Sequence, residues 1–296
     1  METKQRLLRL IKLAHGIVDR PDLEKHRQSQ DQIGELIGRV KDLTFQNFDL
    51  EGMNCEWVSL NRAHVKKQVI LHCHGGGYST GSSLYARTLT AKLASCTAME
   101  VLSFDYRLAP EHPYPAALED ALKVWDYLMR KGYGARDVIL TGDSAGGNLA
   151  LALTLKLKEQ GRFLPRGLVL MSPWTDLTSS GESIREKKDL DPVLTEAYLS
   201  SMLHDYAKGA NLKDPYVSPL FGDFTGFPPT YVQVGENEIL LSDSTRLVER
   251  MKAAGVVAKL DVFEGMWHVF QMAPFKTAYE AMDRNVAFII EELMHF

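Results

Sequence analysis

The sequence of 296 residues has few cysteines and no long apolar run. Its three cysteines, Cys55, Cys73 and Cys96, cannot all pair, and none stands in a Cys-x-x-Cys or Cys/His spacing that binds a metal. We therefore expect no metal site and a reduced, cytoplasmic setting. No run approaches the roughly 18 apolar residues of a membrane span. Residues 1–20 have the spacing of an amphipathic helix but no signal-peptide apolar centre, which predicts a soluble protein.

The excess of negative over positive charge is also small. The formal net charge is −4, and the chain contains no block of like charges. This gives no electrostatic reason to expect nucleic acid or an anionic membrane surface as partner, so we expect a small, neutral molecule. The apolar content of 45% is enough to bury one large core or two modest ones.

Short apolar runs alternate with helical patterns along most of the chain. Runs of strand length occupy 69–72, 99–104, 138–140, 167–171, 231–234 and 257–263, and helical patterns occupy 84–95, 115–129, 147–159, 242–254 and 275–294. This order predicts an α/β fold with a mostly parallel sheet flanked by helices. An alternating segment at 45–60 adds a strand or hairpin, so about eight strands are expected.

Two segments depart from this pattern. Residues 22–41 are polar and only weakly periodic, so the regular core is expected to begin after them. Between Trp174 and Phe227, Pro-containing steps enclose one amphipathic helix near 195–206, which predicts an insertion over the sheet. Strand 257–263 is a candidate exposed edge, and such an edge is compatible with a homodimer.

The sequence Gly-Asp-Ser-Ala-Gly at 142–146 places Ser144 between a strand and a helix. A serine hydroxyl needs a base to become a nucleophile, and a sharp strand-to-helix turn exposes its oxygen near helix-terminal N–H groups. Gly142 and Gly146 permit such a turn. The alternatives are a glycine-rich turn that binds nothing or a phosphate-binding loop at a helix N-terminus.

A second glycine loop, His-Gly-Gly-Gly-Tyr at 74–78, follows the strand at 69–72. Consecutive glycines let backbone N–H groups approach a substrate oxygen without interference from side chains. The nucleophile turn requires such a loop earlier in the chain than its serine. The expected oxyanion donors are the N–H groups of Gly76 and Gly77, with Gly75 as a further candidate, together with that of Ala145.

The base must follow the serine and an acid, because this type of fold orders its catalytic groups as Ser, Asp/Glu, His. The histidines that remain are His204, in the inserted helix, His268, and His295, which is the penultimate residue. His268 lies in a glycine-containing turn just after strand 257–263, from which a side chain reaches the carboxyl edge of the sheet. We therefore choose His268.

The acid is expected in the loop that leaves strand 231–234, since catalytic groups gather at the carboxyl ends of parallel strands. Glu238 is our choice, as the group that orients the imidazole and stabilises its protonated form. Glu236 and Asp243 are its rivals. Asp243 is also placed to begin or cap the helix that follows.

Together these motifs resemble the hormone-sensitive-lipase-like carboxylesterases, also called bacterial family IV, of the α/β-hydrolases. The residues that carry the resemblance are His74–Tyr78 (HGGGY), Tyr106–Pro113 (YRLAPEHP), Gly142–Asn148 (GDSAGGN), Asp191-Pro192, and Gly265–His268 (GMWH). The resemblance implies an ester hydrolase without a cofactor that prefers short to medium acyl chains. It also implies a structural role near the oxyanion loop for the segment Tyr106–Pro113. The family often has Asp-Pro-Leu where this chain has Glu238-Ile239-Leu240.

The family resemblance further implies a helical cap built from the N-terminal segment and an insertion before the acid-bearing strand. The expected organisation is an N-terminal cap segment at 1–42, a catalytic core at 43–177 and 213–296, and a cap insertion at 178–212. An apolar face of Leu199, Met202, Leu203 and Tyr206 is expected either to cover the acyl pocket or simply to pack against the core. Two other functions use the same scaffold, an amide or formamide hydrolase and a non-catalytic small-molecule receptor.

Overall fold

The computed structural model describes residues 23–37 and 41–294. The strands are β1 (Leu43–Leu50), β2 (Met53–Leu60), β3 (Val65–Cys73), β4 (Met99–Phe104), β5 (Val138–Asp143), β6 (Gly167–Met171), β7 (Thr230–Gly235) and β8 (Ala258–Phe263). The helices are α2 (Leu23–Ile37), α3 (Ser83–Thr97), α4 (Ala116–Arg130), α5 (Ala145–Glu159), α6 (Ser183–Glu186), α7 (Glu196–Tyr206), α8 (Leu241–Ala253) and α9 (Lys276–Met294). Short 3₁₀ turns, η1 (Ala135–Asp137), η2 (Pro219–Phe221) and η3 (Phe270–Met272), complete the described elements.

The eight strands form one sheet in the order β1-β2-β4-β3-β5-β6-β7-β8. The first pairings, β1 with β2 and β2 with β4, are antiparallel, whereas all pairings from β4 to β8 are parallel. The predicted fold class, the strand count and the hairpin at 45–60 are therefore confirmed. The carboxyl ends of the parallel strands meet at one edge, where the loops after β3, β5, β6, β7 and β8 come together.

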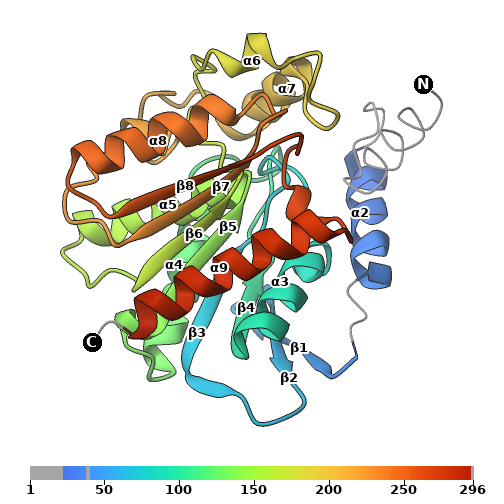
Figure 1. Cartoon of the computed structure of the whole chain (residues 1–296), viewed down its shortest axis with the longest axis vertical. Helices are drawn as coiled ribbons and strands as arrows, with labels where there is room; N and C mark the ends of the chain where they lie inside the picture. Colours follow the sequence, from blue (N-terminus) through green and yellow to red (C-terminus); the bar gives the residue numbers. More distant parts are fainter. Residues whose placement is uncertain (1–22, 38–40, 295–296) are drawn as a thin grey trace.

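Helices cover both faces of the sheet (Figure 1). Helices α4, α5 and α8 cover the face on which Val69 and Leu71 of β3 are buried, and α3 and α9 cover the other face, on which Ile70 of the same strand is buried (Figure 1). Central strands are consequently apolar on both sides, which explains their continuous apolar runs in the sequence. Burying both faces makes the sheet a rigid support for the loops at its carboxyl edge.

Helix α2 lies beside α3 (Figure 1), in the segment whose weak periodicity gave no helix prediction. Its buried positions are His26, Gln30 and Gly34, spaced four apart on one face. A Cβ at Gly34 would stand 2.2 Å from the carbonyl oxygen of Leu84, so glycine allows α2 and α3 to approach closely. The contact face has helical spacing but polar and small residues, and hydrophobic periodicity alone misses such a face.

Helices α6 and α7 come from the insertion between β6 and β7, and they lie beyond the end of the sheet, at the top of Figure 1. The predicted helix near 195–206 is confirmed as α7. The amphipathic helix predicted for residues 1–20 and the penultimate His295 both lie outside the described residues. Among the helices that are described, none is both long and apolar enough to cross a membrane.

Candidate active site

Ser144 occupies the turn between β5 and α5 with φ of 52° and ψ of −120°. This is a strained conformation for a residue with a side chain, and strain of this kind concentrates at functional sites. The turn is tight because a Cβ at Gly142 would stand 2.3 Å from the carbonyl oxygen of Gly146, and one at Gly146 would stand 2.0 Å from that of Cys73. The two glycines therefore allow the turn that aims the Ser144 hydroxyl out of the sheet edge.

His268 faces Ser144 from the loop between β8 and η3. Its Nε2 lies 2.9 Å from Ser144 Oγ, a hydrogen-bonding distance, across 124 positions of sequence. The histidine is only 4% exposed. A histidine ring at this distance can take the proton of the serine hydroxyl when the oxygen attacks an electrophile.

Glu238 is fully buried and stands on the far side of the His268 ring. Its Oε1 lies 3.7 Å from Nδ1 of His268, while its Oε2 accepts hydrogen bonds from the Ser172 hydroxyl (2.8 Å) and the Gly235 N–H (3.2 Å). Within the described residues, neither Glu238 Oε1 nor His268 Nδ1 has a hydrogen-bond partner. These two buried atoms face one another, at a separation slightly longer than a hydrogen bond. Catalytic hydrogen bonds are often long without substrate.

Ser172 joins the acid and the base, and sequence reasoning missed it. It follows β6 directly, with φ of 50°, and its hydroxyl donates to Glu238 and accepts from the N–H of Val269, the residue after His268 (3.1 Å). The available signal was its position, because the carboxyl end of β6 lies at the same edge as those of β5 and β7.

The electrostatic surroundings raise the pKa of His268 above its ordinary value. Burial lowers this pKa, but the carboxylate of Glu238, followed by the negative charges of Asp191 and Asp143, outweighs the effect of burial. The site therefore stabilises the protonated imidazole that forms when His268 accepts a proton.

The two rivals of Glu238 point elsewhere. Glu236 is half-buried and accepts a hydrogen bond from the N–H of Gly265 (2.9 Å), which fixes the turn before His268. Asp243 lies in the first turn of α8, and its Oδ2 accepts the N–H groups of Thr175 (2.7 Å) and Asp176 (2.8 Å). Its carboxylate thus binds the backbone of the loop after β6 and not its own helix terminus.

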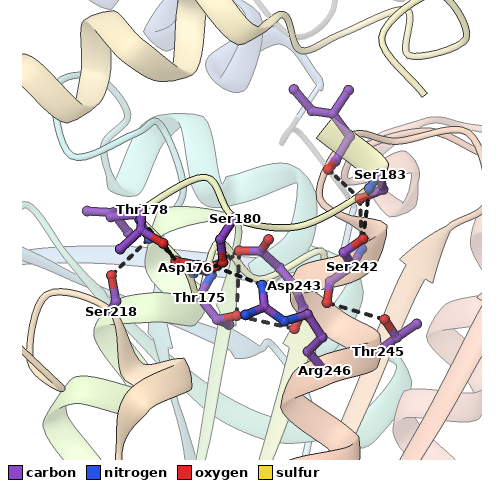
Figure 2. A network of polar contacts seen from close by, with 12 residues as sticks. Thr175, Asp176, Thr178, Ser180, Ser183, Ser218, Ser242, Asp243, Thr245 and Arg246 are labelled. Atoms are coloured by element: carbon purple, nitrogen blue, oxygen red, sulfur yellow. Dashed lines mark hydrogen bonds and ion pairs between the residues drawn. The ribbon is translucent and has the colours of Figure 1, made fainter. Parts of the chain in front are cut away.

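Figure 2 shows this second polar network, which ties the loop after β6 to the start of α8. Asp176 accepts hydrogen bonds from Ser180 (2.5 Å) and Thr178 (2.5 Å) and pairs with Arg246 (2.8 Å). Burial raises the pKa of Asp243 to about 7, although the hydrogen bonds that it accepts from two backbone N–H groups lower this pKa. Asp243 belongs to a structural network that stiffens the wall behind the site.

The glycine loop lies against the nucleophile turn. Gly76 and Gly77 have φ of 111° and 60°, and both line the same cleft as Ser144. The N–H of Gly75 donates to Oδ1 of Asp143 (3.0 Å), and His72 Nε2 lies 3.3 Å from the same oxygen. Asp143 therefore joins the two loops, and Gly75 uses its N–H in that link.

Tyr106 supports the glycine loop through contacts with His74, as the resemblance implied for the segment Tyr106–Pro113. Its hydroxyl donates to the carbonyl oxygen of His74 (2.9 Å), and the two rings stack with centroids 4.1 Å apart. Within the same segment, the N–H of Ala109 donates to the carbonyl oxygen of Tyr78 (2.8 Å). The predicted structural role is confirmed.

Helix α2 closes the outer side of this loop. The guanidinium of Arg27 donates to the carbonyl oxygens of Ser79 (2.9 Å) and Ala109 (2.9 Å) and forms a two-bond ion pair with Glu111 (2.8 and 3.0 Å). Gln30 accepts the N–H of Gly81 (3.1 Å) and lines the cleft. Part of the N-terminal segment therefore helps to build the site.

The cleft over Ser144 is small, with a cavity volume of about 30 Å³, and it is partly open to solvent. Its inner wall contains the nucleophile, the base and the glycine loop, with Trp174, which the sequence had not singled out. Its outer wall comes from the insertion and consists of Val193, Leu194, Tyr198, Leu199 and Met202. Of the four residues expected on the apolar face of α7, Leu199 and Met202 line the cleft. Leu203 is half-buried and packs against the core, and the ring of Tyr206 stacks on Tyr78 with centroids 3.6 Å apart.

The remaining polar candidates add no second centre. His204 is exposed on α7, away from the buried site. Within the part of the chain that the structure describes, no group of three or more His, Cys, Asp or Glu side chains is arranged to hold a metal ion. The three cysteines, all within that part, are free.

The chain is similar to known proteins in sequence and in fold. A family model of the alpha/beta hydrolase fold matches residues 70–272. An esterase of Acinetobacter venetianus is 42% identical over 255 residues, which cover 85% of this chain and 84% of the relative. An acetyl-hydrolase of Streptomyces hygroscopicus is 34% identical over 249 residues, covering 84% and 83%. A solved esterase from the bacterial hormone-sensitive lipase family has a TM-score of 0.92 at 34% identity over 99% of both chains.

Proposed function

Since this chain belongs to the hormone-sensitive-lipase-like carboxylesterases of the α/β-hydrolase family, we propose that it hydrolyses esters through Ser144, His268 and Glu238. The observation that carries the proposal is the hydrogen bond between His268 Nε2 and Ser144 Oγ, with a buried carboxylate on the far side of the ring. A nucleophile, a base that contacts it and a third group that orients the base are the parts that acyl transfer requires.

In the proposed reaction, Ser144 Oγ attacks the ester carbonyl carbon while its proton passes to Nε2 of His268. The tetrahedral intermediate collapses, the protonated imidazole gives its proton to the leaving alcohol, and an acyl-enzyme remains on Ser144. Water then attacks this ester with His268 again as base, which releases the acid and restores the serine. Glu238 holds the ring in orientation and stabilises the imidazolium throughout.

The negative oxygen of the intermediate is stabilised by the N–H groups of Gly76, Gly77 and Ala145. The two glycines line the cleft beside Ser144, and Ala145 is the first residue of α5, where N–H groups lack intrahelical partners. Gly75 also stood among the expected donors. We assign it to the support of the loop because its N–H already donates to Asp143.

The outer wall of the cleft favours short to medium acyl chains. A Cβ on Gly77 would stand 2.6 Å from Met202, so α7 packs directly on the glycine loop. Leu199 and Met202 line the cleft with Ser144 and offer apolar contact to an acyl chain. We assign α2 and the insertion at 178–212 to a cap of two pieces that together close the cleft.

Hydrolysis of chromogenic esters of graded acyl length by the native chain and by Ser144→Ala tests the proposal. The native chain should prefer short to medium acyl groups, and the variant should lose activity by about six orders of magnitude, as in a serine hydrolase that loses its nucleophile. A matched chromogenic amide distinguishes an esterase from an amide hydrolase. Equal ester hydrolysis by the two proteins would refute the mechanism.

The edge strand β8 is the place where we expect a homodimer to form. Among the described strands it pairs with β7 alone. Val262 on the strand is 46% exposed, and Val257 just before it is 59% exposed. Size-exclusion chromatography with light scattering tests this, and a monomer at micromolar concentration would contradict it. The predicted cytoplasmic setting rests on the free cysteines and is tested by fractionation of the cells that make the protein.

A further inference from the structure

Asp191 and Pro192 stand in the insertion, between α6 and α7, and the mechanism above leaves them without a role. Asp191 is half-buried. It lies 48 positions before the acid loop in sequence, yet it reaches that loop directly. Its carboxylate therefore joins two parts of the site that the chain builds separately.

Each oxygen of the carboxylate has its own set of partners. Oδ1 accepts the N–H groups of Val193 (2.8 Å) and Leu194 (2.9 Å), the first two donors available after Pro192, which has none. Oδ2 accepts the N–H of Ile239 (2.9 Å). Val193 and Leu194 form part of the substrate cleft, and Ile239 directly follows Glu238.

The position of Ile239 matters because Glu238 is held by few contacts. Its side chain is fixed by Ser172 and the N–H of Gly235, and its backbone lies in the turn that leads into α8. A hydrogen bond to the next N–H limits how far this turn can move away from His268. A displacement of about 1 Å in a catalytic group can cost about two orders of magnitude in rate.

Asp191 also acts through its charge. The titratable groups that face it are His268 and Glu238: the first favours its ionised form and the second opposes it. Burial raises the pKa of Asp191 to about 6, which the attraction of His268 and the N–H groups of Leu194 and Ile239 partly offset. Above that pH its negative charge adds to that of Glu238 in favouring the protonated imidazole.

We propose that Asp191 is a positioning residue of the same site, which holds the Glu238 turn against the insertion and places a second negative charge near His268. This inference rests on the proposed function, because it assigns Asp191 to the support of that triad. It also explains why an aspartate followed by proline stands in a loop otherwise rich in exposed, charged residues.

Asp191→Asn removes both contributions, and two readouts distinguish them: the rate at high pH reports on position, and the pH at which activity falls reports on charge. An asparagine oxygen still accepts the N–H groups of Val193 and Leu194, but its amide nitrogen cannot accept that of Ile239, and the charge is lost. Asp189→Asn is the matched control, because Asp189 is exposed and lies two positions away in the same loop. Asp191→Ala removes all three hydrogen bonds, and Asp191→Ser is a smaller polar replacement for use if the alanine variant does not fold.

We expect Asp191→Asn to lower kcat/KM at pH 8 to 9 by about tenfold or more, mostly through kcat. The reason is that a displaced Glu238 stabilises the transition state less well. Where the pH profile of each protein is level across this range, His268 is neutral in both, so this loss reports on position. The fall of kcat/KM toward acid should begin at a lower pH than in the native chain, because a charge that raises the pKa of His268 is gone. Asp189→Asn should change neither quantity.

Three outcomes are decisive. If Asp191→Asn lowers the melting temperature but keeps the native kcat and the native pH at which kcat/KM falls toward acid, Asp191 is structural and the inference is wrong. If Ser144→Ala is inactive while Asp191→Asn behaves like Asp189→Asn, the inference fails and the proposed function stands. If Ser144→Ala keeps native activity, the proposed function itself fails. Circular dichroism and thermal melting confirm that each variant is folded.

Discussion

Two buried carboxylates lie five positions apart after β7, and the structure gives them opposite surroundings. Glu238 and Asp243 are both fully buried. Glu238 leaves one oxygen without a hydrogen bond, 3.7 Å from the imidazole of His268. Within the described part of the chain, Asp243 also leaves one oxygen, Oδ1, without a hydrogen bond, but this oxygen does not face His268, and its Oδ2 accepts two backbone N–H groups from the loop after β6.

This difference shows that burial of an acid does not by itself mark a catalytic group. A buried carboxylate must be compensated by partners. In Asp243 the compensation comes from backbone N–H groups that stay in place during a reaction. For Glu238, part of the compensation comes from His268, whose charge changes during the reaction. The carboxylate therefore stabilises the states in which His268 is protonated more than those in which it is neutral.

The largest effect is expected when each acid is removed in turn. Glu238→Ala should lower kcat by about four orders of magnitude, as when the acid of a serine triad is lost. Asp243→Ala should reduce activity far less and chiefly destabilise the fold, because it leaves two buried N–H groups without an acceptor, at about 1–3 kcal/mol each. Steady-state kinetics on a chromogenic ester check this, and a greater loss in Asp243→Ala would reverse the assignment.

Removing the support of Glu238 should have a smaller effect. Ser172→Ala deletes the hydroxyl that donates to Glu238 and accepts from Val269. We expect kcat to fall by about ten- to a hundredfold, since the acid and the base each lose one positioning contact. Ser180→Ala is the matched control, because Ser180 donates to Asp176 in the other network. Equal kinetics in the two variants would show that Ser172 does not position the triad.

The pH profile provides a third test of the comparison. The base must be neutral, so kcat/KM falls as pH decreases through the pKa of His268, which Glu238 and the other carboxylates raise above 6.5. The midpoint of this fall should therefore lie above pH 6.5. In Glu238→Gln the residual activity should fall at a lower pH, because burial then dominates. Asp243→Asn should leave the midpoint unchanged, and an equal shift in both variants would contradict the comparison.

Stability against pH gives the smallest effect and concerns Asp243. Its pKa is about 7 in the folded protein against an ordinary 3.8, so the folded state holds the proton more tightly and stability falls as pH rises through this window. The maximum cost is about 4 kcal/mol, from 1.36 kcal/mol per pKa unit. The side chain in Asp243→Asn still accepts hydrogen bonds from both backbone N–H groups. The melting temperature of this variant relative to that of the native chain should therefore increase from pH 5 to pH 8. A constant difference at both pH values would be inconsistent with this.

Local patterns in the chain predicted much of the site. Ser144 was predictable because a strand, a glycine turn and a helix follow one another within about twenty residues. His268 was predictable because chain order leaves three histidines, and only His268 among them lies in a turn just after a predicted strand. The first prediction uses residues that are neighbours in sequence, and the second uses the order in which this fold places its catalytic groups along the chain. Their pairing at 2.9 Å agrees with that interpretation.

Other parts of the site left little or no trace in the sequence. Helix α2 was missed because its buried face consists of His26, Gln30 and Gly34, whose polar and small side chains conceal the helical period. Ser172 carries no motif, and its role depends on the adjacency of β6 and β7. Asp191 was noticed as part of a Pro-containing step and of a resemblance, but not as a support of the acid, since its partner Ile239 lies 48 positions away.

The sequence by itself determined the order of strands and helices, the strained serine turn, the glycine loop and the histidine turn, because each depends on neighbouring residues. Only the tertiary structure decided which buried carboxylate faces His268 and how α2, Ser172 and Asp191 support the site. The physical reason is that a carboxylate is assigned by its partners, and those of Glu238 and Asp243 come from separate loops that meet at the carboxyl edge of the sheet.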